Sequence, residues 1–252
     1  MPFIIIRKDY KLYLTVPAIL FILASLFLMT CKKLEFERVN KTESGTFTDS
    51  DDGQEYNWVK IGNQVWMAEN LAYLPAVSPP SSGSSISPNY YVYGYEGTSQ
   101  ASAKATSNYA TYGVLYNWPA AMDGASSSSS NPSGVQGICP SGWHLPSDAE
   151  WTELTDFLGG EGVAGGKLKE VGYDHWWSPN TGATDEKGFT ALPGGILDST
   201  FYSIEDYGYW WSATEYNATN AWGRCMIYDD AYVSRGVAFR EVGLSVRCVR
   251  DN

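Results

Sequence analysis

The first thirty residues constrain how this 252-residue chain can fold more than any other feature of its sequence. Arg7, Lys8 and Lys11 precede residues 12–29, a run without a charge. A short basic segment followed by an apolar run is the layout of an export signal, and such a segment takes no part in the folded body. The rest of the chain must therefore supply its own core, and we expect it to do so outside the cytoplasm.

Two interpretations of this segment place the body on a membrane. Residues 28–31, Leu-Met-Thr-Cys, resemble a bacterial lipoprotein box, which implies cleavage after Thr30 and a lipid on Cys31. In the alternative, residues 12–29 stay uncleaved as an anchor, although the run is at the short end of a spanning helix. Release without an anchor is a third possibility. We take residues 1–31 as a lipoprotein signal peptide with its lipidation site.

Residues 32–51 predict a flexible tether. They are polar, carry charges of both signs and hold only scattered large apolar side chains. Little in this stretch could bury a core, so a spacer is the default expectation. Residues 52–252 then form the folded domain.

Charge and aromatic content limit the kind of partner. The net charge of −11 argues against nucleic acid, because phosphate backbones attract Lys and Arg. The chain carries 10 Trp and 18 Tyr. These side chains offer large, rigid and half-polar contact area suited to a binding surface. The competing interpretation is that a β-rich fold buries them in its core.

Strand-like segments occupy both ends of the body, and a helix lies between them. Ser147 and Glu150 form a capping box before an apolar run of helical spacing, and Gly159-Gly160 ends that helix. Gly62-Asn63 suits a two-residue hairpin turn between residues 58–61 and 64–67. A second helix is expected at 163–171, and further strands at 112–118, 209–214, 221–228, 232–237 and 244–250. This pattern predicts an α+β domain.

Seven blocks of the body resemble, in order, the Fibrobacter succinogenes major paralogous domain family. They are DGQEYNWVKIGNQVWMAENL (52–71), YGVLYNW (112–118), ICPSGWHLPSDAEWTEL (138–154), AGGKLKEVG (164–172), GFTALPGG (188–195), YWWSATE (209–215) and GLSVRCVRD (243–251). Members of this family are typically exported, often as lipoproteins of Bacteroidota and Fibrobacterota. The resemblance therefore implies a lipid-anchored protein of the outer membrane or cell surface.

A more distant resemblance concerns the fold. GWHLPSDAEW and SVRCVR are similar to segments of formylglycine-generating-enzyme-like domains. This similarity implies a C-type-lectin-like fold with small antiparallel sheets, one or two flanking helices and long irregular loops. In such folds the first helical region is commonly tied to the last strand, so the resemblance implies a disulfide between Cys139 and Cys248. Cys225 would then remain a free thiol.

The same resemblance does not extend to catalysis. A formylglycine-type enzyme needs two cysteines a few residues apart near its C-terminus, and Cys225 and Cys248 are too far apart in sequence. The chain has two histidines, His144 and His175. We expect His144 to have a packing or turn role, and we expect a protein that is not an enzyme. No cofactor is indicated.

The expected ligand face lies between the helices and the last strands. Aromatic rings and nearby oxygens suit sugars, which present apolar ring faces and hydroxyls. Because side chains of adjacent strand or loop residues cannot all face inward, at least one of Trp176 and Trp177 should be partly exposed, and likewise one of Trp210 and Trp211. The residues expected to bind ligand are Trp176, Trp177, Asn180, Asp185, Tyr207 and Tyr209.

Calcium is an open alternative to a metal-free site. Two oxygen clusters could contribute to the six to eight ligands that Ca²⁺ takes: Asn180, Thr184 and Asp185, or Asp198, Glu205 and Asp206. Neither has the ligand spacing of a known calcium loop, and the EPN and QPD sugar triplets of true C-type lectins are absent. We therefore expect no metal.

The leading hypothesis is a cell-surface lipoprotein whose extracytoplasmic domain binds a glycan or a protein, in adhesion or capture. The second is a structural or assembly component of the bacterial surface. An unrecognised enzyme is the third. The fold alone cannot choose between them, because one fold hosts many functions.

Overall fold

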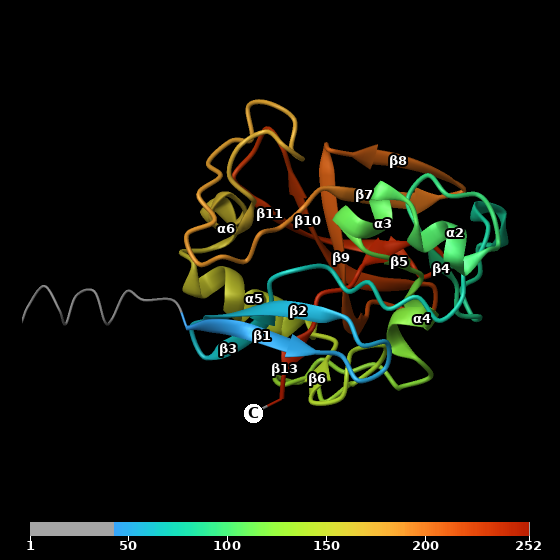
Figure 1. Ribbon diagram of the computed structural model, residues 1–252. Coiled ribbons are helices and arrows are strands. Elements are labelled where there is room, and N and C mark those ends of the chain that lie inside the picture. The colour runs from blue at the N-terminus through green and yellow to red at the C-terminus, as the bar shows by residue number, and fades with distance from the viewer. Residues whose placement is uncertain (1–42, 252) are drawn as a thin grey trace, which may run out of the picture. The chain divides into compact units, whose positions relative to one another are not determined.

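The computed structural model describes residues 43–251. The expectations for residues 1–42, including the lipid on Cys31, lie outside the described residues. Within the described part, no helix combines the length and the apolar character needed to cross a membrane. The fold is mixed α/β, mostly strand, with curled sheets and short helices (Figure 1).

One sheet has five strands and joins the beginning of the described chain to its end. Its order is β1-β2-β3-β13-β6. The predicted hairpin is confirmed, since Ile61 pairs with Gln64 around the Gly62-Asn63 turn. β1 lies within the stretch 32–51 that was expected to be a tether, so the ordered body begins before residue 52. The strands are β1 (Ser44–Thr48), β2 (Glu55–Ile61), β3 (Gln64–Met67), β6 (Trp143–His144) and β13 (Val249–Arg250).

The larger sheet has the order β11-β10-β9-β12-β5-β4, and the β7–β8 hairpin branches from β9. β9 is an interior strand, paired with β10 on one side and with β12 and β7 on the other. β11 is an edge strand. The bounds are β4 (Tyr90–Tyr91), β5 (Leu115–Tyr116), β7 (Gly194–Asp198), β8 (Thr200–Ile204), β9 (Tyr207–Glu215), β10 (Asn220–Ile227), β11 (Val233–Phe239) and β12 (Leu244–Ser245).

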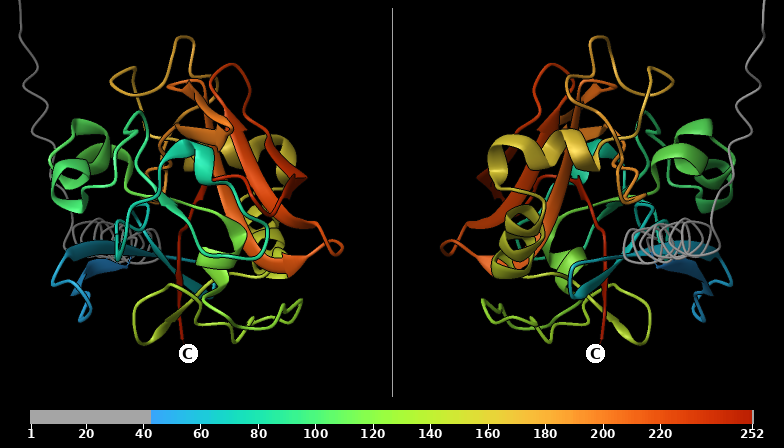
Figure 2. Two further views of the ribbon diagram at one scale, coloured as in Figure 1. Left: turned by 90° about the vertical axis from the view of Figure 1, so that its right-hand side faces the viewer. Right: turned by 90° about the vertical axis from the view of Figure 1, so that its left-hand side faces the viewer.

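The helices are short and come mainly from the middle of the chain. α5 carries the predicted capping box, with Ser147 and Glu150 each bonded to the other's backbone N–H. α5 and α6 cover one face of β9–β11 (Figure 2). The helices are α2 (Gln100–Lys104), α3 (Ser107–Tyr112), α4 (Trp118–Met122), α5 (Asp148–Phe157) and α6 (Glu161–Leu168), with a 3-10 turn, η1 (Pro80–Ser82).

Two expected strands differ from the structure. The segment 112–118 is not one strand, because Tyr112 ends α3 and Trp118 begins α4, leaving only β5 between them. The Asn117 side chain caps α4 by accepting from the N–H of Ala120. The segment 244–250 is divided between the two sheets as β12 and β13. This crossing lets the end of the chain connect the sheets.

Trp210 and Trp211 are both fully buried, so the expectation that one of them is exposed is wrong. Alternation does send the two rings to opposite faces of β9. Trp210 packs in a core with Trp66 and Trp151, beneath α5 and α6. Trp211 packs in a second core with Tyr116, among others, and its Nε1 donates to Tyr116 O at 2.7 Å. β9 is covered on both faces, and neither ring reaches solvent.

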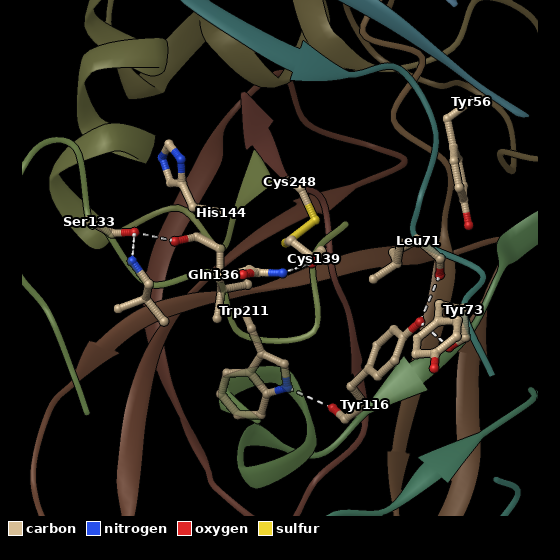
Figure 3. The surroundings of a disulfide bond; sticks show 12 residues. Tyr56, Leu71, Tyr73, Tyr116, Ser133, Gln136, Cys139, His144, Trp211 and Cys248 are labelled. Atoms are coloured by element: carbon tan, nitrogen blue, oxygen red, sulfur yellow. Dashed lines mark hydrogen bonds between the residues drawn. A yellow bond between two sulfur atoms is a disulfide. The ribbon is translucent and has the colours of Figure 1, made fainter. Parts of the chain in front are cut away.

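A disulfide joins Cys139 to Cys248, the pair that the resemblance implies (Figure 3). Their Cα atoms are 6.0 Å apart, and both side chains are buried. The bond ties the loop before β6 to the residue before β13. Cys225, on β10, is a free thiol. The cross-link therefore fastens the last strand to the middle of the chain.

Candidate functional site

A cavity of about 300 Å³ opens on the face of β9–β11 opposite α5 and α6. We refer to it as the sheet pocket. Small residues at alternate positions of two paired strands make its floor: Gly223 faces Gly236, and Cys225 faces Ser234. Glycine adds no side chain above a strand, so the floor is flat at the first of these pairs. A Cβ placed on Gly236 would meet no atom within 4 Å.

Aromatic and aliphatic side chains form the walls of the sheet pocket. Tyr202 comes from β8 and Tyr209 from β9, while Phe239 stands at the end of β11. Tyr202 and Phe239 are 44% and 58% exposed, so their rings are open to an incoming ligand. The remaining apolar lining is Ile196, Val237, Ala238, Val242 and Leu244. A pocket lined mainly by apolar and aromatic groups with a few polar ones is the usual form of a small-molecule site.

The charge of the sheet pocket is negative. Asp198 lines it from the end of β7 and is exposed. Arg224 also lines it, but its guanidinium lies on the α5 side, where it donates to Asp148 Oδ1 at 2.6 Å and to Thr152 Oγ1 at 3.0 Å. The positive charge of Arg224 is therefore held by α5 and does not serve the pocket.

The Cys225 thiol at the floor is protonated at neutral pH. Burial, aided by the Asp206 carboxylate, raises its pKa to about 12. Burial also raises the pKa of Tyr209, and Cys225 contributes to that rise. A thiol with a raised pKa is a poor nucleophile, because the thiolate is the reactive form. The pocket therefore offers a neutral, weakly polar floor and no activated nucleophile at this position.

Two pairs of aromatic residues lie near the start of β9. The rings of Tyr207 and Tyr209 stack with centroids 5.5 Å apart. Trp177 is 52% exposed, and its ring meets Tyr228 edge-on at 5.8 Å. Backbone bonds from Trp177 to Glu205 and from Tyr228 to Asp206 hold both beside the start of β9. Tyr207 and Tyr209 point to the pocket side of β9, whereas Tyr228 packs against the core beneath α5 and α6. We call Trp177 and Tyr228 the aromatic face.

The structure brings together two of the six residues expected to bind ligand, since Tyr207 stacks on Tyr209 and Tyr209 lines the sheet pocket. Trp177 is exposed but contacts Tyr228 on the aromatic face and does not line the pocket. Of the adjacent pair Trp176 and Trp177, one ring is exposed, as expected, although both lie in a loop and not in a strand. Trp176 is the buried member at 1% exposure, and its Nε1 donates to Ala191 O at 2.9 Å.

Asn180 and Asp185 serve the chain's own loops. Asn180 is buried, and its Nδ2 donates to the carbonyls of Glu170 and Gly172, both at 2.8 Å. Asp185 accepts from the N–H and the hydroxyl of Thr190. Among the described residues, no group of three or more His, Cys, Asp or Glu side chains is placed to hold a metal ion.

The two histidines are both paired with carboxylates. His144 is buried, with Nε2 2.7 Å from Glu150 Oε1 and Nδ1 2.7 Å from Asp251 Oδ1. His175 is partly exposed, and its Nδ1 lies 2.8 Å from Glu170 Oε2. Neither histidine lines the sheet pocket.

This arrangement defines a mixed α/β domain with a shallow aromatic pocket on a curled sheet. The chain belongs to the Fibrobacter succinogenes major domain family, which it matches over residues 59–250. No curated protein and no solved structure matches the chain.

Sequence reasoning missed most of the sheet pocket. Its floor had a visible signal, since small residues recur at every second position in 221–225 and again in 234–238. The register that places Gly223 opposite Gly236 cannot be read from either segment alone. The β7–β8 wall had a weaker signal, because Ser199 makes its tight turn with a positive φ of 60° and no glycine marks it.

Proposed function

We propose that this chain is a cell-surface lipoprotein whose extracytoplasmic domain binds a glycan or a protein ligand. The sheet pocket carries the proposal, since it is a concave aromatic site whose Tyr202 and Phe239 rings are exposed. Tyr and Trp are frequent at binding hot spots because they bury large area and lose little side-chain entropy. Binding at this pocket fits adhesion or capture at a bacterial surface.

The lipid anchor is supported by the sequence alone. Residues 28–31 resemble a lipoprotein box, and residues 12–29 have the apolar run of an export signal. A disulfide between Cys139 and Cys248 suits an oxidising compartment outside the cytoplasm. We propose that Cys31 carries the lipid and that the domain lies outside the cytoplasm, at the outer membrane.

We also propose a C-type-lectin-like fold for the domain. The first described strand, β1, and the last, β13, share one sheet, which brings the two ends of the domain together. Helices α5 and α6 flank the sheets, and long irregular segments connect the strands. These features support the assignment that the resemblance of GWHLPSDAEW and SVRCVR suggested.

Binding accounts for the site better than catalysis. Cys225 has a raised pKa, and both histidines are engaged by carboxylates away from the pocket. The ring and hydroxyl groups of the pocket suit recognition. We therefore propose a binding protein that needs no cofactor.

The test is a binding screen with the full chain purified in detergent. It is applied to a glycan array and to a panel of bacterial-surface and host proteins. Saturable binding to at least one ligand is the expected result. If no ligand binds, and deletion of the gene removes a surface assembly, the domain is a structural component and the binding proposal fails.

A further inference from the structure

The sheet pocket has the size and chemistry of a site for one uncharged sugar unit. Its cavity of about 300 Å³ is at the lower limit of the usual range for ligand sites, roughly 300–1,000 Å³. A cavity of this size suits the end of a glycan chain. We propose that it binds a neutral pyranose, held over the Gly223–Gly236 floor beside the rings of Tyr202 and Tyr209. This inference rests on the proposed function and names its ligand class.

The apolar part of the pocket matches the face of a sugar ring. A pyranose presents C–H groups on its ring face, and such a face packs well on a flat surface or an aromatic ring. The floor is flat because Gly223 and Gly236 lie opposite each other, with Ser234 and Cys225 as the next pair. Tyr202 and Tyr209 rise at the side of that floor.

Polar groups at the pocket are free to receive hydroxyls. Within residues 43–251, the side chains of Asp198, Tyr202 and Ser234 have no hydrogen-bond partner in the protein, and all three line the pocket. The Asp198 carboxylate accepts only, whereas the two hydroxyls can both donate and accept. Together they match the paired donors and acceptors of a sugar.

Charge favours a neutral ligand over an acidic one. The Asp198 carboxylate is the charged group that faces the pocket. The Arg224 guanidinium donates to Asp148 and Thr152 on the other side of the sheet. A uronic acid, sialic acid or sulfated sugar would bring a second negative charge near Asp198 without a base to balance it. An ammonium group on the ligand would add little affinity, because a single exposed carboxylate binds a cation weakly in water.

Gly236 allows the pocket to be filled without disturbing the strand. Its φ lies outside the left-handed region, and a side chain there would enter open space. Valine suits a strand position, so Gly236→Val should fold and occupy the floor. The matched control is Gly162→Leu on α6. A Cβ at Gly162 also meets no atom within 4 Å, but α6 lies on the side of the sheet opposite the pocket.

The experiment uses ligand-observed NMR with the full chain. The probes are the methyl glycosides of glucose, galactose, mannose and N-acetylglucosamine, the acidic sugars glucuronate and N-acetylneuraminate, and acetyl-lysine methylamide as a stand-in for a protein side chain. At least one neutral glycoside should bind, and the other two classes should not. Gly236→Val should weaken that binding at least tenfold with an unchanged melting temperature, while Gly162→Leu should leave it intact.

Asp198→Asn provides a second test that does not depend on filling the pocket. It removes a charged acceptor and should lower the affinity for the neutral glycoside by roughly tenfold, because hydrogen bonds to charged groups are stronger than those between neutral groups. It should also permit detectable binding of glucuronate.

Two results would overturn the assignment while leaving the proposed function in place. One is a neutral glycoside that binds Gly236→Val as well as the wild type. The other is binding, in the broad screen, of acidic sugars or proteins only. Absence of any ligand in both experiments would remove the proposed function as well.

Discussion

The imidazole of His144 lies 2.7 Å from the carboxylate of Glu150, through Nε2 and Oε1. Its Nδ1 lies 2.7 Å from Asp251 Oδ1. The other oxygen of Glu150 accepts from the N–H groups of Ser133 and Ser147. One buried side chain thus connects β6, the N-terminus of α5 and the end of the described chain. Both ring nitrogens of His144 face carboxylate oxygens, so both hydrogen bonds form when the ring is a protonated imidazolium, which donates from each nitrogen.

This contact makes stability depend on pH. Burial by itself lowers the pKa of His144, but the bonds and charges of Glu150 and Asp251 outweigh it and raise the pKa above 6.5. The folded chain therefore keeps this proton to higher pH than the unfolded chain does. The stabilisation is complete below the unfolded pKa of about 6.5 and is lost as the pH rises through the folded value. We expect the melting temperature to fall over that interval.

His144→Gln should remove this dependence and lower stability by about 1–3 kcal/mol, since a buried charged acceptor loses its donor. Thermal unfolding of both proteins at a series of pH values measures the effect. His175→Gln is the matched control, because His175 is partly exposed and pairs with Glu170 alone. A variant at 144 that keeps the full pH slope would show that the slope comes from other groups.

The large secondary-structure elements could be predicted where the signal was local. The capping box of Ser147 and Glu150 and the Gly62-Asn63 turn each specify their own structure within a few residues. β9 shows the limit of such reasoning. Alternation correctly sent Trp210 and Trp211 to opposite faces, but exposure depends on what covers each face. The helices and strands that cover β9 come from distant parts of the sequence.

The candidate site was predicted in part for the same reason. Tyr209, which lines the pocket, and Tyr207, which stacks on it, were named from the sequence because aromatic residues near strand ends are conspicuous. The floor of the sheet pocket depends on the register between β10 and β11, which pairs Gly223 with Gly236. Register is fixed by packing across the whole sheet. The recurrence of small residues in 221–225 and 234–238 is therefore visible in the sequence, but it does not show which of these residues lie opposite each other.

Cys31→Ser tests the membrane anchor. If the cysteine is lipidated and becomes the N-terminus, this change should leave an unprocessed precursor that still begins at Met1. Intact mass spectrometry of the native protein should show a chain starting at residue 31 with added acyl mass. Detection of Met1 without lipid in the native protein would favour the uncleaved anchor, for which residues 12–29 are just long enough.

The disulfide should contribute substantially to stability. Cys139 and Cys248 are separated by 109 residues. Closing a loop of that size reduces the entropy of the unfolded chain and so raises its free energy by roughly 4–5 kcal/mol. The double change Cys139→Ser and Cys248→Ser should lower the free energy of unfolding by an amount of this order. Urea unfolding measures it.

Cys225→Ser is the control for that experiment, since Cys225 is a free thiol and its loss opens no loop. In the wild type, its raised pKa should make alkylation at pH 8 slow until the chain is unfolded. Non-reducing peptide mapping should recover Cys139 joined to Cys248. A peptide joining Cys225 to Cys248 would contradict the assignment.

Trp176 and Trp177 are adjacent in the chain but should respond oppositely to replacement by alanine. Trp177 is 52% exposed on the aromatic face, where its Nε1 donates to Glu205 Oε2 at 2.9 Å. Its loss removes a large exposed ring, so a ligand that contacts this ring should lose roughly 2 kcal/mol of affinity while the melting temperature barely changes. Trp176 is 1% exposed in the core with Leu168, so Trp176→Ala should cost about 3–5 kcal/mol of stability.

The pair is informative because both changes delete the same number of atoms one residue apart. Affinity is measured by titration of whichever ligand the screen identifies, at a temperature where both variants are folded, and stability by thermal unfolding. Trp177→Ala that loses stability and affinity together would mean that the ring supports the loop between Glu170 and Asn180 and not a ligand. Trp177→Ala with unchanged affinity would confine binding to the sheet pocket, where Tyr209 and not Trp177 forms the wall. A fall in affinity without a fall in stability, confined to Trp177, is the outcome that places a ligand across the aromatic face.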